Sequence, residues 1–264
     1  MNDIEIILLI TEGEKLDVRL LNQARRLFLT KQNIKVFPVC LNIYNLYKKM
    51  LQYDDFGTEF IDMFLVIKEI IQEQDSSNNL EFLKLERNQI SEIYLFFDYD
   101  GHDTLVEKYP ECIDRMFELF DNETENGKLY INYPMVESYK HPISNEVQVL
   151  DIKSKTHYKT NVAKICDKKL ENINKLEKNE WLKLFLPHLK STNHLFNQEF
   201  LLPKDYHITK KISQHAIYNK QKEHYIDPHK KIMVLSSFSW FLLEYLGEKL
   251  FSEWQTIDNQ GITA

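Results

Sequence analysis

The stretch Ile93-Tyr94-Leu95-Phe96-Phe97-Asp98-Tyr99-Asp100-Gly101 decides the fold of this 264-residue chain. Its five consecutive apolar residues predict a strand that is buried on both faces, and its last four residues predict a tight turn. Such strands are typical of parallel sheets that are covered by helices. The chain is therefore expected to belong to the α/β class.

The segments on either side complete this pattern. The aliphatic run 4–10 predicts a first buried strand, which stops at Thr11-Glu12-Gly13-Glu14. Apolar residues recur at helical spacing over 15–30, and 34–39 predicts a second strand, so these segments form a β-α-β crossover. A helix is expected over 107–120 and another strand over 128–133.

Two further regions are expected to be helical. Residues 43–90 show helical periodicity, broken by a polar turn at 75–79, and we interpret them as a helical insertion. After about residue 150 the pattern becomes mainly helical and ends in an apolar helix over 240–254, which we expect to pack in a core. The predicted organisation is an α/β domain over 1–150 and a basic, mainly helical region over 151–264.

The composition excludes several classes of protein. Only 6 Gly and 7 Pro are present, and neither GxxxxGK[ST] nor GxGxxG occurs, which excludes the common phosphate-cradling loops. Three widely spaced cysteines fit neither a disulfide framework nor a zinc site, so a reducing cytoplasm is the expected location. No apolar run is long enough to span a bilayer, and we expect no membrane partner.

Charge divides the chain more sharply than its net value of −7 suggests. Residues 1–150 carry 15 Lys and Arg against 27 Asp and Glu, whereas residues 151–264 carry 18 against 13. The second half is thus suited to attract a polyanion, although a solvated lysine-rich surface would show the same composition. The lysines that we expect to contact nucleic-acid phosphates are Lys155, Lys159, Lys168, Lys169, Lys210 and Lys211.

The predicted strands end in carboxylates. Glu12 follows the first strand, and Asp98 and Asp100 follow the strand at 93–97. Because ligands bind beyond the carboxyl ends of strands in open α/β sheets, these side chains are candidates for one site. All-oxygen sites suit Mg²⁺, although a single Asp-x-Asp is more often a turn former. Further candidate metal ligands are Glu14, Asp17, Asp103 and Glu137.

These motifs, in this order, resemble the Toprim domain of topoisomerases, primases and overcoming-lysogenisation-defect nucleases. Thr-Glu-Gly-Glu-Lys-Leu-Asp over 11–17 is most similar to the compact Toprim proteins of bacterial anti-phage systems, including the RloB-like and PARIS-type groups. Asn-Tyr-Pro-Met-Val-Glu-Ser-Tyr over 132–139 resembles a later acidic motif of those proteins. The resemblance covers roughly residues 1–145 and implies a Toprim-like parallel sheet flanked by helices.

The resemblance also implies roles for individual residues. Glu12 matches the first-strand glutamate, a metal ligand or general acid/base, while Asp98 and Asp100 match the Asp-x-Asp metal pair. Many relatives carry a second acid four residues after the glutamate, but this chain has Leu16 there and Asp17 next to it. The identity of that second acid, and the role of Glu137 as ligand or structural residue, are therefore open.

The function expected from these features is Mg²⁺-dependent cleavage of nucleic acid, with Mn²⁺ as an alternative metal. The resemblance favours RNA, and tRNA in particular, as the substrate of a toxic antiviral effector, with DNA as an alternative. It also implies an ATPase of the ABC or AAA type as a regulator. A homodimer is left open. Histidines and tyrosines interleaved with the basic residues could add base stacking: His157, His194, His207, His215, His224 and His229, with Tyr158, Tyr206, Tyr218 and Tyr225.

Two rival functions stand beside the nuclease. A haloacid-dehalogenase-like phosphatase is suggested by Phe96-Phe97-Asp98-Tyr99-Asp100-Gly101, but His102 stands where that family has Thr or Val. A non-catalytic Toprim-like partner of an ATPase or nucleic acid is suggested by the missing acid at Leu16. Both alternatives predict that the chain does not cleave nucleic acid.

Overall fold

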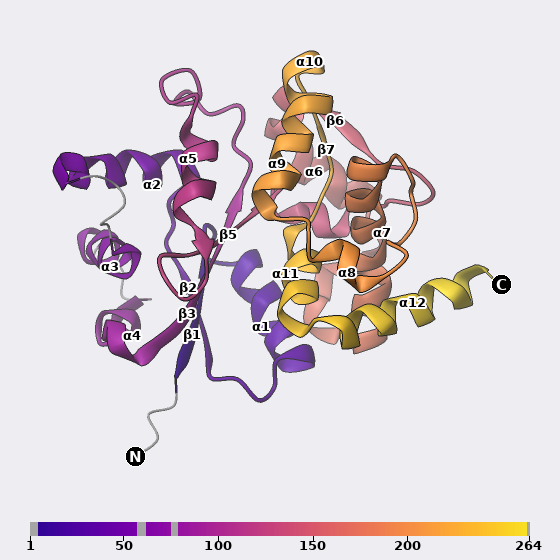
Figure 1. Ribbon diagram of the computed structural model, residues 1–264, viewed down its shortest axis with the longest axis horizontal. Helices are drawn as coiled ribbons and strands as arrows, with labels where there is room; N and C mark the ends of the chain where they lie inside the picture. Colours follow the sequence, from indigo (N-terminus) through magenta and orange to yellow (C-terminus); the bar gives the residue numbers. More distant parts are fainter. Residues whose placement is uncertain (1–4, 57–61, 75–78, 263–264) are drawn as a thin grey trace. The chain divides into compact units, whose positions relative to one another are not determined.

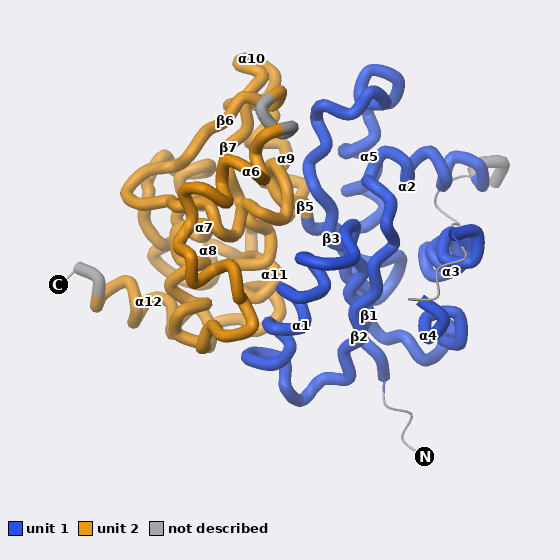
Figure 2. The backbone as a smooth tube through the Cα atoms, turned by 180° about the vertical axis from the view of Figure 1, so that it is seen from behind, with its two compact units in different colours: residues 1–130 blue, residues 131–264 orange. Residues whose placement is uncertain are grey.

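The computed structural model describes residues 5–56, 62–74 and 79–262. The chain forms two compact units, residues 1–130 (unit 1) and 131–264 (unit 2) (Figure 2). The sequence analysis places the division later, near residue 150. The structure divides the chain earlier because Tyr133 and Leu235 exchange two backbone hydrogen bonds of 2.8 and 2.9 Å, which join residues after 130 to the C-terminal half.

Unit 1 is built on a five-stranded sheet in the order β2-β1-β3-β5-β4. Strand β1 is parallel to both of its neighbours, β2 and β3, whereas the short β4 is antiparallel to β5. The predicted α/β class with a mainly parallel sheet is thus confirmed. The strands are β1 (Ile6–Thr11), β2 (Ile34–Pro38), β3 (Ile90–Asp98), β4 (Asp121–Asn122) and β5 (Gly127–Asn132), the last of which runs across the boundary between the units.

Helices cover both faces of this sheet. Every residue of β1 and the last six residues of β3 are buried, as expected for strands that are covered on both sides. In two opposite views α1 lies on one face, while α2, α3 and α4 lie on the other (Figures 1 and 2). The helices of unit 1 are α1 (Leu16–Phe28), α2 (Ile43–Met50), α3 (Met63–Glu73), α4 (Leu80–Leu83) and α5 (Cys112–Leu119), with 3₁₀ turns η1 (Leu51–Phe56) and η4 (Arg87–Gln89).

Two predicted boundaries in unit 1 were wrong. The helix expected over 107–120 begins only at Cys112, because Pro110 lies in the turns before it and the residue that precedes a proline avoids helical geometry. The helical insertion ends before 90, since Ile90 already pairs with Ile6 as the first residue of β3. Part of the polar turn expected at 75–79 lies outside the described residues.

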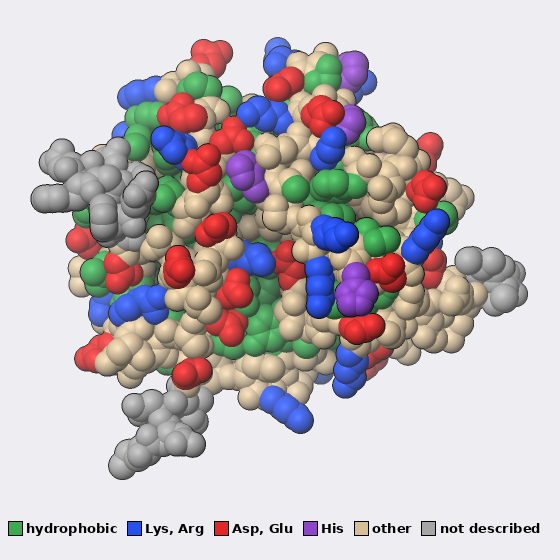
Figure 3. Space-filling view, in the orientation of Figure 1, with side chains coloured by type: hydrophobic (Ala, Val, Ile, Leu, Met, Phe, Trp, Pro, Cys, Tyr) green, Lys and Arg blue, Asp and Glu red, His purple; other side chains and the backbone are tan. Residues whose placement is uncertain are grey.

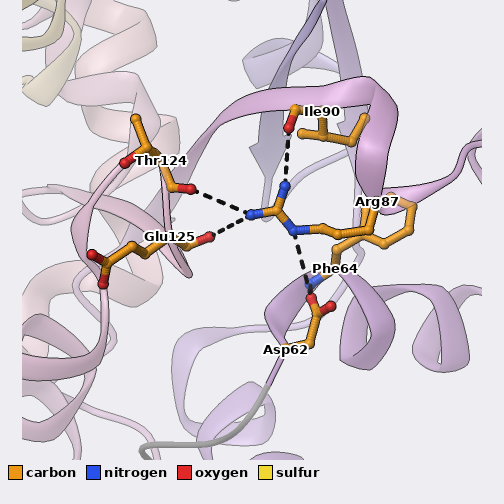
Figure 4. A network of polar contacts seen from close by, with 6 residues as sticks. All are labelled: Asp62, Phe64, Arg87, Ile90, Thr124 and Glu125. Carbon is orange, nitrogen blue, oxygen red and sulfur yellow. Dashed lines mark hydrogen bonds and ion pairs between the residues drawn. The ribbon is translucent and has the colours of Figure 1, made fainter.

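Arg87 links the helical insertion that precedes β3 to the sheet (Figure 4). Its guanidinium donates hydrogen bonds to the carbonyl oxygens of Ile90 (3.0 Å), Thr124 (3.4 Å) and Glu125 (3.0 Å). Its Nε lies 4.0 Å from Oδ1 of Asp62, the residue that caps α3. One side chain thereby joins the start of β3, the β4–β5 turn and the start of α3.

Unit 2 is mainly helical, as predicted, but it also contains an antiparallel pair of short strands, β6 (Val149–Asp151) and β7 (Lys231–Met233). The sequence analysis missed this pair. Its principal helices are α6 (Lys155–Ile165), α7 (Lys178–Asn197), α9 (Gln214–Gln221), α11 (Ser237–Leu246) and α12 (Glu248–Ile262). Shorter turns are η5 (Val136–Lys140), η6 (Ile152–Ser154), η7 (Lys168–Lys175), α8 (Tyr206–Thr209), the π-helical η8 (Lys222–Ile226) and α10 (Asp227–His229).

The apolar C-terminal segment forms two helices instead of the single helix expected over 240–254. Gly247 separates α11 from α12 with a φ of +67°, a conformation that is strained for residues with a side chain. Its N–H donates to the carbonyl of Leu243 (2.9 Å) and so ends α11. The expected core role is confirmed, because Trp240 and Trp254 are both almost fully buried. Among the described residues no helix has the length and apolarity needed to cross a membrane.

Candidate functional site

The carboxyl ends of β1 and β3 bring Glu12 and Asp98 together. Thr11 pairs with Phe96 in the parallel register, and the N–H of Glu12 donates to the carbonyl of Phe96 (3.0 Å). The Glu12 side chain then turns along the sheet edge, where its Oε2 accepts a hydrogen bond of 3.0 Å from the backbone N–H of Asp98. The structure thus places these two predicted site residues in direct contact.

The aspartates that follow β3 are buried. Only 8% of Asp98 and 6% of Asp100 is exposed, and Tyr99 between them is also buried. The ring of Tyr99 lies so close to Gly101 that a Cβ on this residue would come within 2.4 Å of it. A side chain at position 101 would therefore displace the Tyr99 ring.

Asp17 and Glu14, the two acids nearest the first-strand turn, differ in their surroundings. It lies in the first turn of α1 and is 4% exposed, and its Oδ2 would be only 2.5 Å from a Cβ on Gly13. Glu14, in contrast, is exposed and lies 3.6 Å from the ammonium of Lys15. Of the two alternatives, Asp17 is directed back over the turn that carries Glu12, while Glu14 faces solvent.

Asp103 shapes the loop after β3. Its Oδ1 accepts a hydrogen bond from the N–H of Leu105 (2.8 Å), and its Oδ2 accepts one from Nδ2 of Asn42 (2.7 Å). Asn42 is also the N-cap of α2, where its Oδ1 accepts from the N–H of Asn45 (2.9 Å). The loops that follow β2 and β3 are thereby joined. Sequence analysis missed Asn42, although an asparagine directly before a helical pattern is a known capping signal.

The donor set at this edge fits a hard cation, but it is not assembled as a metal centre. Glu12, Asp17, Asp98 and Asp100 offer only carboxylate oxygens, the ligands that Mg²⁺ prefers. Within the ranges that the structure describes, however, no three His, Cys, Asp or Glu side chains are grouped closely enough to hold a metal ion.

Glu137 and Lys159, predicted for different roles, contact each other in unit 2. Glu137 is 2% exposed in η5, and its Oε1 lies 3.0 Å from the ammonium of Lys159 on α6. This contact is an ion pair without the angles of a hydrogen bond. The side chain of Lys159 is itself 73% exposed, so a surface lysine covers a buried carboxylate. Each charge compensates the other in the described structure.

The remaining predicted lysines lie on the surface of unit 2. Lys168, Lys169, Lys210 and Lys211 are exposed, while the side chain of Lys155 lies outside the described residues. Lysine and histidine side chains gather over α8, with acidic side chains beside them (Figure 3). The Lys210 ammonium lies 5.0 Å from the centre of the Tyr206 ring, which favours one position for its charge.

The expected base-stacking surface is smaller than the sequence suggests. Tyr158 and Tyr218 are 3% and 5% exposed, and burial on this scale prevents either ring from stacking on a base. Tyr158 instead stacks on His141, with the ring planes 3° apart and its hydroxyl 3.2 Å from Nδ1. The expectation was wrong for these two tyrosines because core rings and surface rings share the same helical spacing. Tyr206 and Tyr225 are partly exposed.

No family model matches this chain, and comparison with curated proteins and with solved structures also gives no match.

Proposed function

We propose that the chain is a Toprim-like, metal-dependent nuclease whose acidic edge in unit 1 carries the chemistry. The observation that supports this most directly is the contact of the Glu12 carboxylate with the Asp98 backbone at the ends of two parallel strands. Ligand sites of open α/β sheets lie beyond such ends. The buried Asp98, Asp100 and Asp17 supply further carboxylates beside these turns.

In this proposal each acid has a distinct task. Asp98 and Asp100 would hold Mg²⁺ or Mn²⁺, which when bound polarises a phosphodiester and lowers the pKa of a coordinated water. Glu12 can ligate the ion through one oxygen while the other keeps its bond to the Asp98 N–H, or it can accept a proton from the attacking water. Asp17 would complete the ligand set from the first turn of α1. The low exposure of Asp98 and Asp100 would limit competing water at the ion.

Unit 2 would hold the nucleic acid. Exposed lysines at the start of η7 and after α8 place positive charge on its surface, whereas the net charge of unit 1 is negative. Phosphate contacts of this kind are independent of sequence and weaken as salt is raised. RNA is the preferred substrate, which rests on the Toprim resemblance and not on a geometric feature of the surface.

The decisive experiment compares wild type with Asp98→Asn and Glu12→Gln in a cleavage assay on RNA and DNA with Mg²⁺ or Mn²⁺. Both substitutions preserve size, and Glu12→Gln keeps an acceptor for the Asp98 N–H. We expect each to lower the cleavage rate at least about 100-fold, because both remove carboxylate charge at the metal. Asp121→Asn, on the exposed β4, serves as the control and should retain full activity.

Metal titration calorimetry on the same proteins separates binding from catalysis. We expect wild type to bind Mn²⁺ and Asp98→Asn to lose that binding, while the Asp121→Asn control binds as wild type does. Equal cleavage by wild type, Asp98→Asn and Glu12→Gln would refute the proposal that the chain is a nuclease.

The second candidate function is a non-catalytic partner that binds nucleic acid or an ATPase. It is favoured by the absence, in the described ranges, of three metal-ligating side chains grouped around one point. This alternative predicts that wild type binds oligonucleotides in a salt-dependent manner without binding Mn²⁺ and without cleaving. The calorimetric titration therefore discriminates between the two functions even if the nuclease requires a partner for activity.

A further inference from the structure

The first turn of α11 lies in a polar part of the interior of unit 2. Asn132, the last residue of β5, accepts two hydrogen bonds of 3.0 Å at its Oδ1, from the N–H and from the hydroxyl of Ser237. The N–H of Ser236, the N-cap of α11, donates to Nδ1 of His188 on α7 (3.2 Å). All four residues are at most 2% exposed. Strand β5, α7 and α11 therefore meet through polar contacts.

Two polar groups at this point have no hydrogen-bond partner within the described protein. They are Nδ2 of Asn132 and Oγ of Ser236, each belonging to a residue with no exposed surface. The orientation of the Asn132 amide is fixed, because the N–H of Ser237 can donate only to its oxygen. The Asn132 side chain thus contacts the first turn of α11 at Ser237, and Ser236 is the preceding residue and N-cap of the same helix. An orphaned buried polar group costs about 1–3 kcal/mol, so two such groups on residues at the start of one helix favour the binding of a further hydrogen-bonding molecule.

The charges at this point favour a neutral occupant. The start of a helix attracts anions, so an anion is the alternative to a neutral molecule as the occupant. His188, however, accepts a hydrogen bond at Nδ1 and therefore carries no proton there, and its burial lowers the pKa to about 3. The ring is uncharged at neutral pH and supplies no countercharge. Burial of an anion without a countercharge is strongly unfavourable.

We propose that Asn132 Nδ2 and Ser236 Oγ bind one internal water molecule at the start of α11. The amide donates to the water, and the hydroxyl can either donate or accept. A single water suits a site whose residues are at most 2% exposed, and internal waters bind such orphaned groups in most proteins. The water acts as a cap for α11, since the Ser236 side chain caps no backbone N–H itself. It also couples the end of β5 to α11.

A pair of serine-to-alanine variants tests the proposal. Ser236→Ala removes the hydroxyl that binds the water, whereas Ser239→Ala, three residues along α11, removes a buried hydroxyl that donates to the Ser236 carbonyl (2.9 Å). We expect both to lower the folding equilibrium constant about fivefold in urea titrations, as is usual for loss of one hydrogen bond. If the site is dry, Ser236→Ala instead removes an unsatisfied group and should be as stable as wild type or more stable. That result would overturn the proposal.

High-resolution crystals of the full chain, grown with bromide as the only halide, give an independent answer. Density for a water between Asn132 Nδ2 and Ser236 Oγ supports the proposal. Anomalous density of bromide at that position would show an anion site and refute it, and so would a direct contact of the two groups with no density between them.

Discussion

His188 should make the stability of this protein depend on pH in a way that can be calculated. Burial lowers the pKa of its imidazole from 6.5 to about 3, and the nearby His141 also disfavours the charged form, whereas a hydrogen bond from the imidazole to the backbone of Tyr139 raises the pKa. Between these two values the unfolded chain binds a proton that the folded chain does not. Acid therefore favours unfolding, and stability is lost as the pH falls below about 6.5.

The magnitude follows from the size of the shift. Each pH unit below 6.5 costs about 1.4 kcal/mol, so about 2 kcal/mol is lost at about pH 5 and about 5 kcal/mol once the pH reaches the folded-state value. The loss at about pH 5 alone would be a large fraction of the stability of a typical domain. The full stability contribution of neutral His188 is present above about pH 6.5.

Urea unfolding of wild type and His188→Asn at about pH 7.5 and about pH 5 measures this contribution. The carboxylates titrate in both proteins, so their effect on stability cancels when the two free energies of unfolding are subtracted. Asparagine can still accept the hydrogen bond from Ser236 but cannot titrate. We expect wild type to lose about 2 kcal/mol more than His188→Asn over this interval. His157→Asn, at an exposed position on α6, should lose as much as wild type. Equal losses in wild type and His188→Asn would refute the reasoning.

Three further features of the structure can be tested by urea unfolding of substituted proteins. Arg87→Ala should cost about 2–3 kcal/mol, because its partly buried guanidinium binds three carbonyl oxygens, whereas Arg115→Ala should cost little, since its ion pair with Glu118 is exposed. Gly247→Ala should cost about 1–2 kcal/mol through strain at its positive φ, and a normal stability would show that this turn adapts. Lys159→Met should destabilise by about 1–2 kcal/mol at neutral pH, and Glu137→Gln should relieve most of that loss in the double variant. Additive effects of the last two would exclude their coupling.

The sheet of unit 1 could be predicted because its strands are continuous apolar runs that stand apart from helical periodicity. β1 and β3 are buried on both faces, so nearly every residue of the runs at 6–10 and 93–97 had to be apolar. Their parallel pairing then placed Glu12 next to Asp98. This part of the candidate site follows from the fold class alone.

Other features depend on contacts that leave no local pattern. β6 and β7 are three residues each and pair across a long stretch of chain, so no periodicity marks them. The break at Gly247 is hidden because apolar residues continue on both sides of it. The ion pair between Glu137 and Lys159 joins the turn η5 to the helix α6, and each residue by itself has the features of a different kind of site. Such outcomes are decided by tertiary packing.

The pairing of residues near 133 and 150 with residues near 235 affects how the chain is made. Unit 1 has its β1, β2 and β3 strands complete once residue 98 has been synthesised, and α5 soon after. In unit 2, several early residues bind partners that are synthesised much later. Tyr133 pairs with Leu235, β6 pairs with β7, and Asn132 binds Ser237. During translation unit 1 can therefore fold before the segments that pair within unit 2 have all been synthesised. The nascent chain would leave the ribosome with one half formed and the lysine-rich half unfolded for about the time needed to add a hundred residues, roughly 5–20 s.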